Sequence, residues 1–99
     1  MATPESKVKK NVKKILDDFG CYHFSPSTGG YGSSGIPDLI ACYKGKFIGI
    51  ECKAGKNQPT ALQAANIDRI RGCGGVAMVV REDNLDLLVT VLKEMGWDH

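Results

Sequence analysis

The sequence predicts an α/β fold, a small mixed β-sheet flanked by helices in the order α-β-β-β-α-β-α. A two-residue turn signal, Lys44-Gly45, separates two short apolar runs, as in a β-hairpin. Two helical patterns bracket a nearly continuous apolar run at residues 76–80, which is typical of a strand covered on both faces. A chain of 99 residues makes one domain, so residues 1–99 are treated as a single unit.

The first predicted element is an amphipathic helix over residues 5–19. Thr3-Pro4 supplies a cap and a first-turn proline, and Gly20 is a suitable stop. Glu5 lies three residues before Val8, so it begins the buried stripe rather than the exposed face. Glu5 is therefore either a first-turn acid that interacts with the helix dipole or a functional carboxylate.

A short strand is predicted at residues 21–24, and a glycine- and serine-rich segment follows at residues 25–35. The glycines allow positive φ and close backbone approach, so this segment is not a regular element. It is either a flexible linker or a loop that contacts substrate, and its position just before Asp38 favours the loop. Tyr31 in this segment is a candidate for stacking on a base or sugar.

Residues 37–43 and 46–53 form the two arms of the predicted hairpin. A two-residue loop pairs Tyr43 with Lys46 and so fixes the register of every other pair. Even-numbered residues of the second arm then face one side of the sheet and odd-numbered residues the other. We expect Gly49 to leave open space on the odd-numbered face.

In this register Asp38 lies directly opposite Glu51, and Lys53 shares their face of the sheet. Directly opposed side chains have Cβ atoms about 5 Å apart, and like charges placed so are destabilising. Two facing carboxylates beside a lysine therefore suggest a divalent metal ion and a reaction that needs one.

The second half of the chain predicts a helix over residues 60–72, a strand at 76–80 and a helix over 83–96. Gln63 is a polar residue at the N-terminal end of an inward-facing stripe. The link from the third strand through residues 60–72 to the fourth is long enough for a right-handed parallel crossover. The sheet is therefore expected to be mixed, with helices on both sides.

No apolar run approaches the roughly 20 residues that span a bilayer, and the start of the chain lacks a signal-peptide layout. The four cysteines lack the spacing of a zinc site, and we interpret them as reduced core thiols rather than disulfides. The sequence thus predicts a cytoplasmic protein, or one of the host cytoplasm if it is phage-encoded, with no membrane partner and no organic cofactor.

Taken together, the layout resembles the PD-(D/E)xK nuclease superfamily, specifically its compact VRR-NUC branch. The matching residues are Glu5, Gly35-Ile36-Pro37-Asp38, Ile50-Glu51-Cys52-Lys53, and Gln63 followed by Gly74-Gly75-Val76. The short motifs occur often by chance, but their spacing around a hairpin and before a Gln-bearing helix is specific. The resemblance, from residue 5 to about residue 80, implies a restriction-endonuclease-like core. The chain is similar to the stand-alone phage and bacterial members, which are associated with homodimers and Holliday-junction cleavage.

The resemblance implies a catalytic set of Glu5, Asp38, Glu51, Lys53 and Gln63. Asp38 and Glu51 would bind Mg²⁺ or Mn²⁺, and the backbone carbonyl of Cys52 would be a further ligand. Glu5 would reach the metal directly or through a water molecule. Where Cys52 stands the family usually has an aliphatic residue, which is tolerable because only the carbonyl is needed.

Lys53 would orient the attacking water or help to deprotonate it, and Gln63 would support the site. Two nearby carboxylates favour the charged form of an ammonium group, so orientation and charge stabilisation are favoured over the role of a free general base.

The leading hypothesis is a metal-dependent DNA endonuclease, structure-selective and homodimeric, that acts on branched or duplex DNA. DNA contacts are expected from Lys9, Lys10, Lys13, Lys44, Lys46, Lys56, Tyr31, Ser33 and Ser34. A solubilising helix face is the alternative for the first lysine cluster. The other hypotheses are a nicking enzyme or exonuclease, a non-catalytic DNA-binding module, and a small metal-binding regulator. Against the last, the chain lacks the His and Cys ligands that such regulators commonly use.

Overall fold

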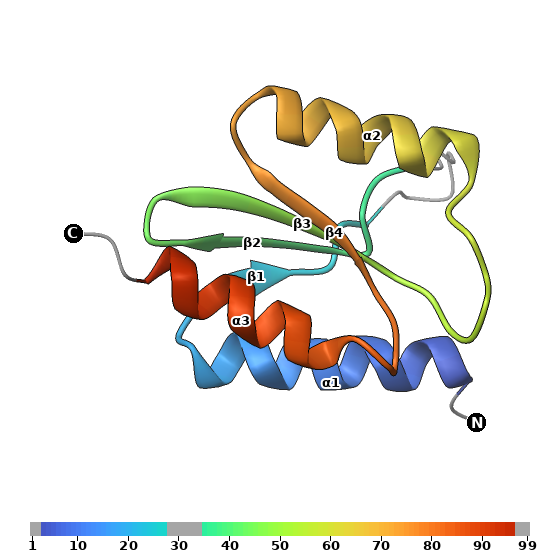
Figure 1. Ribbon diagram of the computed structural model, residues 1–99, viewed down its shortest axis with the longest axis horizontal. Helices are drawn as coiled ribbons and strands as arrows, with labels where there is room; N and C mark the ends of the chain where they lie inside the picture. Colours follow the sequence, from blue (N-terminus) through green and yellow to red (C-terminus); the bar gives the residue numbers. More distant parts are fainter. Residues whose placement is uncertain (1–2, 28–34, 97–99) are drawn as a thin grey trace.

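The computed structural model describes residues 3–27 and 35–96 and confirms the predicted order of elements (Figure 1). The elements are α1 (Pro4–Asp18), β1 (Tyr22–Phe24), β2 (Leu39–Tyr43), β3 (Lys46–Cys52), α2 (Ala61–Gly72), β4 (Val76–Val80) and α3 (Leu85–Met95). Strand and helix ends differ from the predicted ones by at most two residues, and β4 has the predicted bounds. None of the helices in the described ranges has the length and apolar character to cross a membrane.

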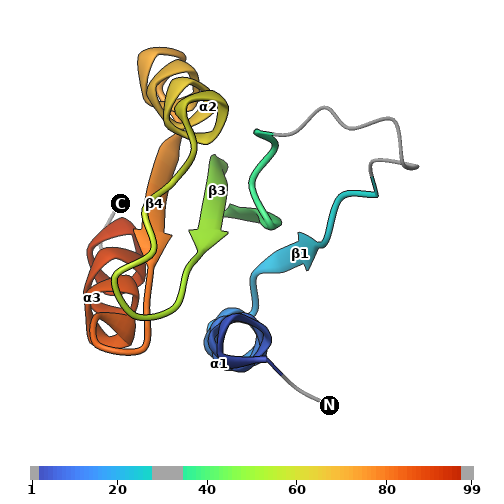
Figure 2. The same ribbon diagram turned by 90° about the vertical axis from the view of Figure 1, so that its right-hand side faces the viewer.

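The four strands form one sheet in the order β1-β2-β3-β4. The pairs β1–β2 and β2–β3 are antiparallel, and β3 and β4 are parallel, as predicted for a crossover through α2. Figure 2 shows α2 over β3 and β4 on one face, whereas α1 and α3 lie on the other face. The sheet is therefore covered unequally: among residues 3–27 and 35–96, no helix lies over the β1–β2 half on the α2 side.

The hairpin between β2 and β3 has the predicted register. Lys44 and Gly45 both have positive φ, 53° and 80°, as a type I′ turn requires. Tyr43 pairs with Lys46, and the ladder runs in step as far as Leu39 and Ile50. Regular pairing stops there, so the carboxylate expected opposite Glu51 lies one residue before β2 rather than within it.

The core lies between the sheet and the layer formed by α1 and α3. The even-numbered residues of β3 point into it, as predicted, and Ile48, Ile50 and Cys52 are buried there. The other buried residues of this core are Val8, Val12, Leu16, Cys21, Leu39, Ala41, Met78, Val80, Leu88 and Leu92. Thr3 caps α1 by accepting a 3.0 Å hydrogen bond from the N–H of Ser6, and a first-turn proline follows it.

The expectation of open space at Gly49 is wrong. A Cβ atom at this position would lie 2.7 Å from Cδ1 of Ile70 and 3.1 Å from Cγ of Pro37. The missing side chain instead lets α2 pack closely on the middle of β3. This contact fixes the distance between α2 and the sheet on the face that carries Glu51.

All four cysteines are free, as predicted, but only two of them are core thiols. Cys21 and Cys52 are buried, whereas Cys42 and Cys73 are exposed. Cys42 is exposed because it faces the α2 side of β2, which no helix of the described part of the chain covers. Cys73 is exposed because it lies at the C-terminal end of α2.

Candidate active site

Glu51 is a buried carboxylate near the end of β3, with only 2% of its surface exposed. Its Oε2 atom lies 3.5 Å from Nζ of Lys53, which is two residues further along and on the same side of the strand. Its Oε1 atom is buried and has no hydrogen-bond partner within the described part of the chain. A buried carboxylate oxygen without a partner is rare in folded proteins and calls for an explanation, such as an ion.

Asp38 is fixed at the same strand end by the backbone of β3. Its Oδ2 atom accepts a 2.8 Å hydrogen bond from the N–H of Cys52. The pairing of β2 with β3 ends at Leu39 and Ile50, so the N–H of Cys52 lies beyond the last strand pair. This N–H donates to the carboxylate of Asp38 instead of to a carbonyl group of the neighbouring strand. The negative charge of Asp38 is strong enough at Glu51 to shift its titration, so the two acids lie close together.

The pKa of Glu51 is raised from 4.5 to about 7. Burial is the largest cause, because a charged carboxylate loses its hydration there. The charge of Asp38 raises the pKa further, and the nearby ammonium group of Lys53 opposes both effects. One lysine therefore does not neutralise this pair of acids, and the site favours an additional positive charge.

A third acid, Glu5, contributes to the pKa of the Cys52 thiol. This thiol lies on the core side of the same strand end. Burial raises its pKa to about 12, and the charges of Asp38, Glu51 and Glu5 add to this effect while that of Lys9 opposes it. Glu5 is half-buried in the first turn of α1. The charge of Glu5 therefore acts on the same end of β3, although α1 lies on the opposite face from Glu51.

These groups fit a hard divalent cation. Carboxylate and carbonyl oxygens are the ligands that Mg²⁺ prefers, and it commonly keeps several water molecules. Asp38, Glu51 and the carbonyl of Cys52 together supply such a donor set, and Oε1 of Glu51 lacks any other partner. No three acidic, histidine or cysteine side chains of residues 3–27 and 35–96 are already grouped closely enough to hold a metal, so water would complete the coordination.

Lys53 is held rigidly, although it lies one residue beyond β3. Its backbone N–H donates to the carbonyl of Val80 at 3.0 Å, which extends the pairing with β4 by one step. Its side chain is only 12% exposed. The ammonium group is therefore directed toward the acids rather than into solvent.

Two residues that the sequence analysis missed fix the loop that follows Lys53. The N–H of Gly55 donates to Oε1 of Glu82 at 2.7 Å, and Nη2 of Arg81 donates to the carbonyl of Asn57 at 2.8 Å. The partners are 27 and 24 residues apart in the chain. No local pattern could have revealed these bonds, since they depend on how β4 returns beside β3.

Gln63 forms a capping box at the start of α2. Its Oε1 atom accepts a 2.8 Å hydrogen bond from the N–H of Thr60, and its own N–H donates to Oγ1 of Thr60 at 3.2 Å. This arrangement explains why a polar residue begins an inward-facing stripe. The predicted support for the acidic site remains a prediction, because this side-chain oxygen is already engaged.

The lysines predicted to bind DNA do not form one cluster. Lys10 and Lys13 are exposed on α1, Lys9 is half-buried near the acidic site, and Lys56 is exposed in the loop after Lys53. The first three follow the helix that carries Glu5, so phosphate contacts there would bring DNA toward the acids.

Lys44 and Lys46 lie at the opposite end of the hairpin. Nζ of Lys44 lies 5.4 Å from the centroid of the Tyr43 ring, and both lysines are exposed. Lys46 and Glu51 are five positions apart along β3, a distance of about 17 Å at 3.3 Å per position. The remaining predicted contacts, Tyr31, Ser33 and Ser34, lie outside the described residues.

Comparisons with known proteins point to nuclease families. A family model described as archaeal Holliday junction resolvase (Hjc) matches residues 4–95. Among solved structures, a chain described as a VRR_NUC domain is similar with a TM-score of 0.68 and 24% sequence identity, over 96% of this chain and 92% of that one. The comparison with curated proteins found no match.

The fold is that of a PD-(D/E)xK nuclease. Within that class, the chain belongs to the archaeal Holliday junction resolvase (Hjc) family. The predicted fold is thereby confirmed, and the VRR-NUC resemblance is confirmed at the level of the fold. Membership of this family suggests a structure-selective DNA endonuclease.

Proposed function

We propose that this chain is a Mg²⁺- or Mn²⁺-dependent endonuclease that cleaves four-way DNA junctions as a homodimer. The observation that carries the proposal is the buried, unpartnered Oε1 of Glu51 beside Asp38 and Lys53. Family membership supports branched DNA as the substrate, because the matching family is one of Holliday junction resolvases.

Asp38, Glu51 and the carbonyl of Cys52 would hold the cation. When bound, the cation offsets the negative charge of the scissile phosphate and lowers the pKa of a water molecule that it holds. The hydrogen bond from Cys52 N–H keeps Asp38 in place before any cation arrives. Part of the site is therefore preorganised, while Glu51 keeps one oxygen for the incoming ion.

Lys53 acts as a fixed positive charge beside the attacking water. Its Nζ atom is 3.5 Å from Oε2 of Glu51, so the side chain points into the acidic site. A protonated lysine donates hydrogen bonds to a water molecule or a phosphate oxygen and stabilises the developing charge. Glu5 acts on the same strand end, directly or through a water molecule, and the effect of its charge on the pKa of Cys52 supports this role.

The lysines of α1 hold the DNA backbone. Each phosphate contact by a lysine releases counterions, so affinity falls with salt. Lys10 and Lys13 are exposed, one helical turn apart, and would contact phosphates without touching the acids. Replacing both with Gln should weaken junction binding and reduce the salt slope of log K by about 2.

The experiment that tests the proposal is a cleavage assay. The protein is incubated with labelled four-way junction, flap, duplex and single-stranded DNA, each with Mg²⁺, Mn²⁺ or EDTA. The proposal predicts paired symmetrical cuts across the junction with metal and none with EDTA. Products that shorten from an end would indicate an exonuclease, single cuts a nicking enzyme, and binding without cuts a DNA-binding module.

Variants of the two acids test whether the reaction takes place at this site. Asp38→Ala and Glu51→Ala should abolish cleavage while junction binding persists. Asp68→Ala is the matched control, since Asp68 is an exposed acid on α2. Near-normal turnover by a pure Glu51→Ala protein would refute the site.

A further inference from the structure

The loop that follows Lys53 passes the turn between β4 and α3 and is held by side chains of that turn (Figure 2). Backbone pairing of β3 with β4 continues as far as the bond from the N–H of Lys53 to the carbonyl of Val80. Donors and acceptors of a parallel pair advance by two residues a step, so the next bond would join the N–H of Gly55 to the backbone carbonyl of Glu82. The side chain of Glu82 takes the place of that carbonyl, since its Oε1 atom accepts from Gly55 at 2.7 Å. Glu82 therefore extends the pairing one step beyond Lys53.

The shape of the turn explains why a side chain is used. β4 ends at Val80, and the chain turns at residues 82 and 83. Oδ1 of Asn84 accepts from the N–H of Arg81 at 2.6 Å, and Nδ2 of Asn84 donates to the carbonyl of Val79 at 3.2 Å. Asn84 is also the N-cap of α3, yet within the described part of the chain its side chain makes no capping bond. The amide group of Asn84 thus stabilises this turn rather than the helix.

Arg81 holds the same loop through a bond of opposite polarity. Its Nη2 atom donates to the carbonyl of Asn57 at 2.8 Å, whereas Glu82 accepts from Gly55. The N–H of Asn57 donates to the carbonyl of Ala54 at 3.1 Å, which closes the loop into a single turn. Two adjacent side chains therefore fix the loop at two points, one as a donor and one as an acceptor.

We propose that Glu82 and Arg81 are positioning residues for the reaction, because they fix the loop after Lys53 and so direct its ammonium group at the acidic site. Nζ of Lys53 lies 3.5 Å from Oε2 of Glu51, and the lysine side chain is only 12% exposed. Groups that act on a reaction must be held within about 0.5 Å of the productive geometry. A displacement of about 1 Å can reduce the rate about 100-fold. This inference rests on the proposed function, which places Lys53 beside the attacking water.

Two simpler roles for these side chains make different predictions. Residues that only stabilise the fold would lower the melting temperature and leave the cleavage rate of the folded protein unchanged. Residues that contact DNA would change junction affinity and its dependence on salt. Glu82 is an exposed acid that would repel phosphate, whereas its bond to Gly55 accounts for its orientation. The contacts within the protein therefore favour positioning over DNA binding for Glu82.

Glu82→Gln and Glu82→Ala separate the hydrogen bond from the charge. The first variant keeps a side-chain oxygen that accepts from Gly55, and the second removes it. In single-turnover cleavage of a four-way junction with Mg²⁺, Glu82→Gln should keep nearly the wild-type rate and Glu82→Ala should be about 10- to 100-fold slower. Junction affinity in a gel-shift assay should stay the same in both. Asp83→Ala is the matched control, since Asp83 is the next exposed acid of the same turn.

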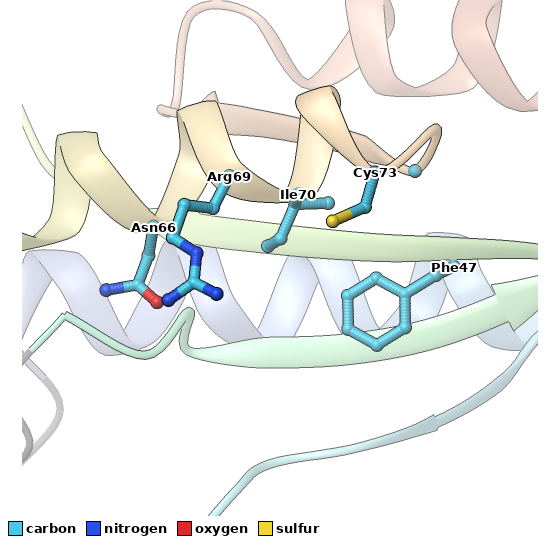
Figure 3. Close-up of a pocket in the computed structure, with 6 residues that line it drawn as sticks. Phe47, Asn66, Arg69, Ile70 and Cys73 are labelled. Atoms are coloured by element: carbon cyan, nitrogen blue, oxygen red, sulfur yellow. The ribbon is translucent and has the colours of Figure 1, made fainter.

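Arg81→Met tests the second bond in the same assays. It should slow cleavage without weakening junction binding, because the donor to Asn57 is lost. Arg69→Met is the charge-matched control, since Arg69 is exposed on α2 near the other end of β3. A hollow of about 350 Å³ lies there, lined by Phe47, Asn66, Arg69, Ile70, Cys73 and Gly75 (Figure 3). An equal loss of junction affinity in both arginine variants, with normal cleavage rates, would assign Arg81 to DNA binding and overturn its positioning role.

A double-mutant cycle shows whether Glu82 acts through Lys53. Residues that act through one another have non-additive effects. In a Lys53→Met background, Glu82→Ala should therefore slow cleavage less than about 3-fold, because the group that it positions is already gone. Equal losses in the two backgrounds would overturn the inference.

Nuclear magnetic resonance without DNA or metal tests the inference separately from the nuclease activity. Glu82→Ala should speed amide exchange at Gly55 and shift the ¹³Cε resonance of Lys53, whereas Glu82→Gln and Asp83→Ala should leave both close to the wild type. Thermal melts identify any variant that fails to fold, and Arg81→Met gives the same readout if Glu82→Ala does so. An unchanged Lys53 resonance in the folded variants would overturn the inference. A wild-type protein that cleaves no junction would refute the proposed function instead, and the resonance of Lys53 would still decide whether these residues position it.

Discussion

The carboxylate of Asp38 accepts a hydrogen bond from the backbone N–H of Cys52, with 2.8 Å between Oδ2 and N. This bond holds an acid from the start of β2 against the end of β3, which carries Glu51 and Lys53. It satisfies a strand N–H and positions a proposed metal ligand at the same time. Its two roles, structural and electrostatic, can be separated by mutation.

Asp38→Asn keeps a hydrogen-bond acceptor and removes the charge, whereas Asp38→Ala removes both. In chelator at pH 8, Asp38→Asn should be at least as stable as the wild type, because it relieves repulsion with Glu51. Asp38→Ala should be less stable than Asp38→Asn by about 1–3 kcal/mol, since it leaves the N–H of Cys52 without its partner. Urea unfolding of the three proteins measures this difference, and equal stability of the two variants would show that the bond contributes nothing.

Burial of Glu51 should make the metal-free fold less stable as pH rises. The pKa of Glu51 is about 7 in the folded protein against 4.5 ordinarily. Below pH 4.5 the carboxyl group is protonated in both states. Between pH 4.5 and pH 7 this carboxyl group is ionised in the unfolded chain but still protonated in the folded one. The free energy of unfolding therefore falls as pH rises, by up to about 3 kcal/mol once the pH exceeds 7.

Glu51→Gln removes this titration. In chelator, its advantage in unfolding free energy over the wild type should grow between pH 4.5 and pH 7.5, as measured by urea unfolding at each pH. Glu94→Gln, which changes an exposed acid on α3, is the control. A difference that stays constant with pH would contradict the raised pKa.

Lys53→Met should reduce cleavage at least about 100-fold, as loss of a fixed electrostatic group at a reacting centre does. Junction binding should change little, because the side chain is mostly buried and lies among acids. Single-turnover cleavage and gel-shift assays measure the two effects. Lys56→Met, three residues further along in an exposed loop, should keep nearly full cleavage; equal losses in both variants would assign Lys53 to DNA binding.

Gln63→Ala separates capping from catalysis. Gln63→Ala removes the bond from the N–H of Thr60 and should destabilise the protein by about 1 kcal/mol, and Thr60→Ala should do about the same because it removes the other bond of the capping box, from the N–H of Gln63. If Gln63 also supports the site, its variant should lose more cleavage than Thr60→Ala at equal stability. Matching kinetics would restrict Gln63 to the helix cap.

The sequence predicted the hairpin and its consequences well, because they follow from local rules. Lys44-Gly45 selects a type I′ turn, and strict alternation along β3 then places Glu51 and Lys53 on one face. The predicted face of Asp38 depended only on that register.

Other features depend on how distant segments pack. Gly49 was expected to leave a gap, but Ile70 of α2 fills it, and no local pattern states how closely a helix approaches a sheet. Cys42 is exposed because α2 covers only half of its face. The hydrogen bonds from Arg81 and to Glu82 likewise join segments that only the parallel crossover brings together.

Titration calorimetry of Mn²⁺ into the wild type and Glu51→Gln tests the central claim most directly. At pH 7 the wild type should bind Mn²⁺ and release protons, since a carboxylate with a pKa of about 7 must ionise to become a ligand. Glu51→Gln should bind more than about 10-fold more weakly and without that proton release. Equal affinity and equal proton release in the two proteins would contradict the assignment of Glu51 as a metal ligand.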